Sequence, residues 1–86
     1  MKKTISQQIG QVIRDLRLEA GLSQVEFSDK CGFYQTYLSR IENGKANPTV
    51  NALDVIASGL GITIFELWEI TKTKASVGIA TGKSDY

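Results

Sequence analysis

The stretch from Leu22 to Gly44 constrains this chain more than any other, because it specifies where two short helices begin and end. Its start, Ser23-Gln24-Val25-Glu26, has the spacing of a capping box, in which residues 23 and 26 exchange side-chain-to-backbone hydrogen bonds. Gly32 and Gly44 each follow a helical segment, and glycine readily adopts the left-handed conformation that ends a helix. The stretch therefore predicts a helix, a tight turn and a second helix over residues 34–43, which is a helix-turn-helix.

The second of these helices has a polar side without a carboxylate. At 100° per residue, Ile41 and Tyr34 fall within about 60° of Leu38 and form one apolar stripe with it. The opposite side carries amide, hydroxyl and guanidinium groups, from Gln35, Thr36, Ser39, Arg40 and Asn43. Such groups hydrogen-bond to base edges and phosphates, although a solvated polar face gives the same pattern. We interpret this side as a DNA-reading surface on which Gln35, Thr36, Ser39 and Arg40 contact bases and Asn43 contacts a phosphate.

The composition argues against catalysis and metal binding. The 86 residues include no histidine and one cysteine, Cys31, which excludes an internal disulfide, a histidine triad and a four-cysteine zinc site. The carboxylates are scattered, without a matched acid and base pair. We therefore expect no enzymatic activity, no cofactor and no metal. No apolar run has the length of a membrane span, and no signal-peptide core follows Met1-Lys2-Lys3, so we expect a cytoplasmic, nucleoid-associated protein with no membrane partner.

The charge is distributed unevenly along the chain. The net charge is only +1, but residues 1–45 carry seven basic and five acidic side chains. Residues 46–71 carry three acidic side chains and no basic one. The positive end therefore coincides with the helix-turn-helix, which favours phosphate binding there.

Two further helices are predicted from their caps and apolar spacing. Thr4 can cap a helix that ends near Ala20, and its inward positions are Ile9, Val12, Ile13 and Leu16. Thr49 can cap another helix, whose inward positions are Val50, Leu53, Ile56, Ala57 and Leu60. Between the reading helix and this one lies a loop, because Pro48 disfavours helical backbone before it. We expect Lys45 and Asn47 in this loop to contact phosphates; an ordinary solvated loop is the alternative.

A fifth helix is predicted from the capping box Thr63-Ile64-Phe65-Glu66, and we expect it to end at about Ile70. It is too apolar for its length to be buried entirely in one small monomer. Exposed apolar patches of this kind usually mark an interface, so we assign to a dimer interface Ile64, Phe65, Trp68 and Ile70. For Trp68, packing in the core is the alternative.

The chain is thus expected to form a compact, all-α domain of five helices over residues 1–70, followed by a flexible polar tail at residues 71–86. Within this tail, residues 75–80 could also pair as an edge strand with a partner. The segment from Gly78 to Ser84 resembles a phosphate-binding loop but has three rather than four residues between its glycines. We therefore do not expect nucleotide binding.

With these residues in place, the chain resembles the Cro/C1-type (XRE) helix-turn-helix regulators over about Ile9 to Trp68. The matching pieces are Ile13 to Gln24, Tyr37 to Lys45, Pro48-Thr49 and Leu60-Gly61-Ile62. The resemblance implies a five-helix, lambda-repressor-like fold, a homodimer and sequence-specific operator binding. It also implies that Gln24 contacts a phosphate and that Arg17 and Glu42 form an ion pair.

Two positions depart from the family pattern. Ser28 stands where alanine is usual, and its hydroxyl needs a carbonyl acceptor, expected within its own helix. Phe33 and Tyr34 make the turn bulkier and more aromatic than usual. We therefore expect Tyr34 or Tyr37 to contact the DNA backbone.

The sequence as a whole predicts a homodimeric transcriptional regulator that binds a roughly palindromic double-stranded operator. Its length resembles that of restriction-modification controller proteins and of small phage or plasmid repressors. One alternative is an antitoxin that represses its own operon and binds a toxin through residues 71–86. Another is a helix-turn-helix used only for protein contacts, which would show no salt-dependent DNA binding.

Overall fold

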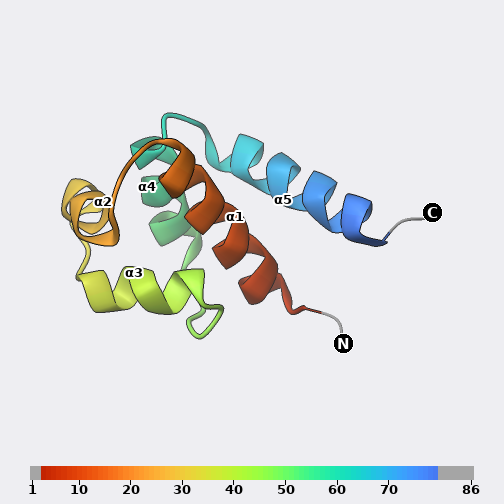
Figure 1. The fold of residues 1–86 in the computed structure, drawn as a ribbon, viewed down its shortest axis with the longest axis horizontal. Helices are drawn as coiled ribbons and strands as arrows, with labels where there is room; N and C mark the ends of the chain where they lie inside the picture. The colour runs from red at the N-terminus through yellow and green to blue at the C-terminus, as the bar shows by residue number, and fades with distance from the viewer. Residues whose placement is uncertain (1–2, 80–86) are drawn as a thin grey trace.

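The computed structural model describes residues 3–79, with side chains through Lys74, and over that range the chain forms five helices and no strand. The helices are α1 (Ile5–Glu19), α2 (Gln24–Cys31), α3 (Gln35–Glu42), α4 (Val50–Gly59) and α5 (Ile64–Ile79) (Figure 1). The all-α, five-helix architecture expected from the sequence is confirmed. Figure 1 shows α2 and α3 together at one end of the molecule, while α5 extends toward the other.

The four helices with a predicted side-chain cap, α1, α2, α4 and α5, begin directly after the capping residue. Thr4 and Gln7 form a reciprocal box at α1, and Ser23 and Glu26 form another at α2. At α5 the Glu66 amide donates to the Thr63 hydroxyl at 3.0 Å, and the Thr63 amide donates to the Glu66 carboxylate at 2.8 Å. These bonds satisfy amide groups that have no partner within the helix. The helix starts are therefore local properties of the sequence.

The core is formed by side chains from all five helices. Its buried apolar side chains are Ile9, Val12, Ile13, Phe27, Leu38, Ile41, Ile56, Ala57 and Leu67. Two predicted inward positions are wrong, because Tyr34 is 85% exposed and Val50 is also exposed. Tyr34 is the N-cap of α3 with an extended backbone, so the helical spacing used to place it does not apply.

The fifth helix does not end at Ile70 but continues to Ile79. Thr71 is buried and donates its hydroxyl to the Leu67 carbonyl at 2.8 Å, and Lys74 lies 3.5 Å from the carboxylate of Asp15 on α1. Contacts with α1 thus support a segment whose composition had suggested a tail. The edge strand considered for residues 75–80 is wrong over 75–79, which are helical. Residues 80–86 lie outside the described residues, as does most of the Gly78–Ser84 segment, and the domain boundary at residue 70 stays a prediction.

Candidate nucleic-acid interface

The orientation of α3 is set by two of its apolar side chains. Leu38 and Ile41 are at most 1% exposed, so the helix cannot rotate without uncovering them. On the other side the structure brings together the four predicted base-reading residues, of which Gln35, Thr36 and Arg40 are exposed and Ser39 is half-buried. The polar side of α3 therefore faces away from the protein's own core. Its base-reading role stays a prediction.

A buried ion pair fixes the end of α3 to α1. Nε of Arg17 lies 2.6 Å from Oε2 of Glu42, and Nη2 donates to Oε1 at 3.0 Å. The two side chains are 7% and 1% exposed. Nη1 of Arg17 also donates to the carbonyl of Leu22 at 2.8 Å. This bond connects the turn before α2 to the same network. This is the pair that the family resemblance implied, and it holds both helices of the motif to α1.

Gln24 extends this network toward the exposed side of α3. Its Nε2 donates to Oε1 of Glu42 at 3.0 Å, and its Oε1 accepts from Nε2 of Gln35 at 3.4 Å. In this conformation the Gln24 amide contacts other side chains of the motif. A phosphate contact would use its second N–H, since the amide nitrogen has two.

A polar hollow of about 540 Å³ lies along α3 and the loop that follows it. The residues lining it are Tyr34, Thr36, Tyr37, Arg40, Lys45, Ala46 and Asn47. No carboxylate is among them, and Arg40 and Lys45 supply positive charge. The Tyr37 ring is held edge-on to that of Phe33, with 5.2 Å between ring centroids. Four of the six predicted phosphate residues thus meet in one place with the chemistry that phosphates require.

The two remaining predicted phosphate residues, Gln24 and Asn43, do not line this hollow. Nδ2 of Asn43 donates to the Ser39 carbonyl at 2.9 Å, which satisfies a group at the end of α3. Arg40 makes a similar contact through Nη2, which donates to the Lys45 carbonyl at 3.0 Å. The remaining guanidinium donors of Arg40 donate to no protein acceptor within residues 3–74 and can reach a base or a phosphate.

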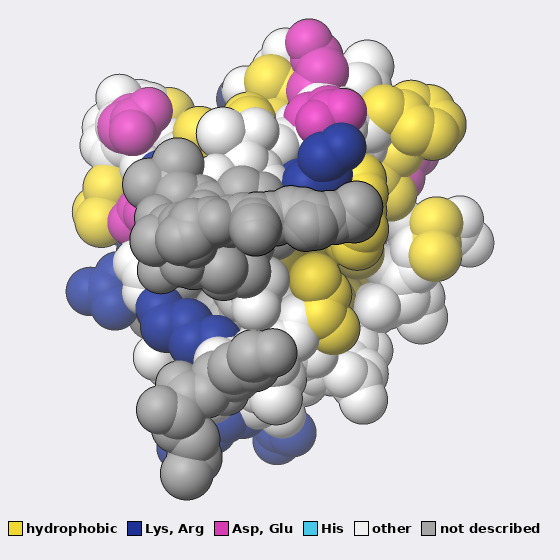
Figure 2. Space-filling view, turned by 90° about the vertical axis from the view of Figure 1, so that its right-hand side faces the viewer, with side chains coloured by type: hydrophobic (Ala, Val, Ile, Leu, Met, Phe, Trp, Pro, Cys, Tyr) yellow, Lys and Arg dark blue, Asp and Glu magenta, His cyan; other side chains and the backbone are white. Residues whose placement is uncertain are grey.

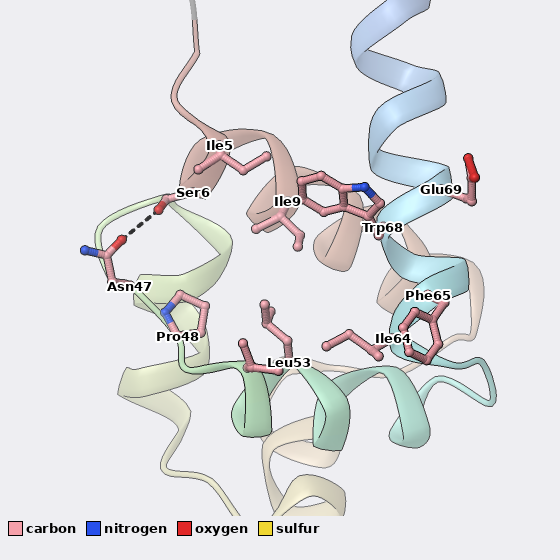
Figure 3. Close-up of a pocket in the computed structure, with 11 residues that line it drawn as sticks. Ile5, Ser6, Ile9, Asn47, Pro48, Leu53, Ile64, Phe65, Trp68 and Glu69 are labelled. Carbon is pink, nitrogen blue, oxygen red and sulfur yellow. Dashed lines mark hydrogen bonds between the residues drawn. The ribbon is translucent and has the colours of Figure 1, made fainter.

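An apolar groove of about 630 Å³ lies on a different side of the molecule (Figure 3). It is lined by Ile5, Ser6, Ile9, Asn47, Pro48, Val50, Leu53, Ile64, Phe65, Trp68 and Glu69. Phe65 is 79% and Trp68 53% exposed, so the core-packing alternative for Trp68 is not what the structure shows. Ile64 and Ile70 are both half-buried and pack against the core, but only Ile64 also lines the groove. On the face in Figure 2, hydrophobic side chains gather on the right and most Lys and Arg side chains at the lower left.

Neither a metal-binding cluster nor an activated thiol is found in the described part of the chain. No group of three or more metal-ligating side chains occurs there. Burial raises the pKa of the Cys31 thiol above its ordinary 9.0, which favours the unreactive protonated form. Within residues 3–79, no helix by itself has both the length and the apolar character needed to span a bilayer. Helices α4 and α5 reach that length and apolar character only when they are counted together, and the two are bent by 91° relative to each other.

Comparison with known proteins identifies the family. A family model described as helix-turn-helix matches residues 13–67, which is more than half of the chain. The chain is a helix-turn-helix protein of the XRE type. It is similar to the uncharacterized HTH-type transcriptional regulator y4dJ of Sinorhizobium fredii, with 44% identity over 59 residues, 69% of this chain and 77% of that protein.

Two controller proteins are also similar to this XRE-type chain. Control protein C.MunI of a Mycoplasma species is 43% identical over 60 residues, covering 69% of this chain and 81% of C.MunI. The restriction-modification controller protein C.Esp1396I, solved as a tetramer in complex with its natural 35-base-pair operator, has a TM-score of 0.78 and 27% identity, covering 86% and 97% of the two chains. These relatives are named as regulators and control proteins, not enzymes, and the family resemblance drawn from the sequence is confirmed.

Sequence reasoning missed two residues that shape this XRE-type site. Gly10 lies on the buried side of α1, where its missing side chain lets the end of α3 approach closely. An isolated glycine on the inward face of a predicted helix is a signal for such an approach. Ser6 donates its hydroxyl to Oδ1 of Asn47 at 2.9 Å, and no local pattern links residues 41 positions apart.

Proposed function

We propose that this protein is a transcriptional regulator that binds double-stranded operator DNA in a sequence-specific manner, as a homodimer on a roughly palindromic site. The observation that carries the proposal is the exposed, carboxylate-free side of α3, held rigidly by the buried Arg17–Glu42 pair. A rod with this side chain chemistry suits the major groove of DNA. The proposal includes no catalytic step, cofactor or metal, and it places the protein at the nucleoid in the cytoplasm.

The side chains of α3 divide by the chemistry they offer. Gln35 has the amide that pairs with adenine, and Arg40 has the guanidinium that pairs with guanine, while Thr36 and Ser39 offer hydroxyls. The polar hollow beside them would receive a backbone phosphate next to Arg40 and Lys45. Gln24 and Asn43 are proposed as further phosphate contacts.

The apolar groove supports the homodimer. Two of its exposed side chains, Phe65 and Trp68, are large aromatic groups that a monomer leaves in contact with water. We propose that a second copy covers them, with Ile64 in the same interface, whereas Ile70 does not line the groove. Two α3 helices related by this contact would enter successive major grooves about 34 Å apart. Nothing within the described residues favours the antitoxin alternative.

Selection from a random pool of DNA duplexes, at two salt concentrations, tests the proposal. The wild-type protein should enrich a site with two related half-sites about ten base pairs apart, bound more weakly at the higher salt concentration. The Gln35→Ala/Arg40→Ala variant is the matched control, because it keeps Leu38 and Ile41 and should lose the enriched sequence. Absence of any enriched site, or affinity independent of salt, would contradict the proposal.

A further inference from the structure

Asn47 lines both the apolar groove and the polar hollow. It lies in the loop between α3 and α4, lines the apolar groove together with Ser6, and lines the polar hollow together with Arg40 and Lys45. Its Oδ1 accepts a hydrogen bond of 2.9 Å from the Ser6 hydroxyl, which α1 presents from its first turn. The two ends of one amide group therefore face different surroundings.

Figure 3 shows the direction of this amide. The oxygen of Asn47 points toward Ser6, and the nitrogen points away from it and out of the groove. Within the described part of the chain, that nitrogen donates to no protein group. It is an N–H donor at the edge of a hollow that also holds a guanidinium and an ammonium group. A phosphate oxygen is the acceptor that such a set of donors fits.

The loop and the end of α3 also contact α1 at points other than the Ser6–Asn47 bond. The loop begins at Gly44, where an added Cβ would lie 2.8 Å from the Cα of Gln7, so the backbones already touch there. Gly10 makes a second close backbone approach, to the end of α3. Both are contacts between backbones, separate from the exposed side-chain bond between Ser6 and Asn47. The bond instead determines which side of the amide faces outward.

We propose that Ser6 is a positioning residue for DNA binding, whose hydroxyl holds Oδ1 of Asn47 so that the amide nitrogen donates to a backbone phosphate beside Arg40 and Lys45. This inference rests on the proposed function. It adds to it a residue of α1 that lies outside the helix-turn-helix. When the phosphate accepts from the amide nitrogen, the amide oxygen needs a donor, and Ser6 supplies that donor.

Five variants test the inference: S6A, S6T, N47A, N47D and S6A/N47A. Their affinity for the duplex that the wild-type protein selects is measured by fluorescence anisotropy at two salt concentrations. N47A should bind about tenfold more weakly than the wild type, because a hydrogen bond to a charged group usually contributes about that much affinity. S6A should lose part of that affinity, S6T should retain it, and the double variant should bind no more weakly than N47A.

N47D separates a DNA contact from a structural role. Its carboxylate still accepts from Ser6, but it places a negative charge against the phosphate. We expect it to lose more affinity than N47A, with the extra loss shrinking as salt rises and screens the repulsion. Ser58→Ala, which removes an exposed hydroxyl of α4 outside both hollows, is the control and should bind like the wild type.

The outcomes are distinct. If S6A and N47A bind as tightly as the wild type, or if N47D binds as well as N47A at low salt, the inference is overturned while the proposed function stands. If thermal stability falls in step with affinity in S6A and N47A, the bond is structural and the inference is again overturned. If the wild-type protein binds no duplex, the proposed function fails, and this inference fails with it.

Discussion

Gly10 of α1 packs directly against the backbone of Ile41 at the end of α3. A Cβ added at Gly10 would overlap the carbonyl oxygen of Ile41 and lie 3.0 Å from that of Glu42. The contact places the end of the reading helix on α1 at a separation that only glycine permits. The position of α3 thus depends on the absence of a side chain in another helix.

Replacing Gly10 by alanine should lower the free energy of unfolding by about 1–3 kcal/mol, the usual cost of overpacking. Alanine has the higher helix propensity, so a purely local effect would have the opposite sign. Urea denaturation measures the difference. Gln11→Ala, at an exposed position of the same helix, is the control and should change stability by less than about 0.5 kcal/mol. Equal stability of the two variants would contradict the close contact.

Removing Glu42 should be more damaging than removing the whole ion pair. Glu42→Ala leaves the guanidinium of Arg17 buried without its carboxylate, which typically costs about 3–5 kcal/mol. The double variant Arg17→Met/Glu42→Leu buries no charge and should recover part of that loss. Chemical denaturation compares the two. A double variant less stable than Glu42→Ala would show that the pair contributes net stability rather than orientation.

Arg40 and Lys45 should affect DNA binding in different ways. Arg40→Ala should lose about 1–3 kcal/mol at one base position of each half-site and relax the preference there. Lys45→Ala should weaken binding to all sequences alike and reduce the salt slope by about 1. Binding to a set of single-base operator variants at several salt concentrations distinguishes them. Uniform weakening by Arg40→Ala would make Arg40 a phosphate contact instead.

Trp68→Ala should weaken the dimer by about 2 kcal/mol or more, because large aromatic side chains commonly dominate interfaces. Sedimentation equilibrium measures the dissociation constant of the dimer. Leu18→Ala is a matched control, since Leu18 is 55% exposed against 53% for Trp68 but does not line the groove. If the two variants dimerise equally well, the groove is not the dimer interface.

The capping box of α2 predicts a pH dependence of stability. The backbone amide of Ser23, which donates to Oε1 of Glu26 at 2.9 Å, lowers the pKa of that carboxyl below its ordinary 4.5, and the Ser23 side chain lowers it further. A lowered pKa in the folded state means that this stabilisation is complete above the unfolded-state pKa and is lost as pH falls through the folded-state pKa. The melting temperature of Glu26→Gln should therefore change less with pH below about pH 4.5 than that of the wild type, as measured by thermal melts. Identical profiles would contradict the stabilising role of the carboxylate.

The sequence alone determined the features that depend on neighbours within four residues. Helix starts at Thr4, Ser23, Thr49 and Thr63 follow from side chains that each reach the amide three residues on. The exposed polar side of α3 followed from its helical period, because Leu38 and Ile41 can be buried only if the opposite side faces out.

The tertiary structure decided what depends on distant parts of the chain. Whether α5 stops at Ile70 depends on α1, since Asp15 lies across from Lys74 in the extended helix. Whether an apolar side chain of α5 is exposed depends on which neighbour covers it, so Phe65 and Ile70 differ although both are apolar. The Ser6–Asn47 bond joins residues 41 positions apart. Local hydrogen bonds and helical periodicity depend only on residues that are close together in the sequence. The contacts between distant residues form only once the helices have packed.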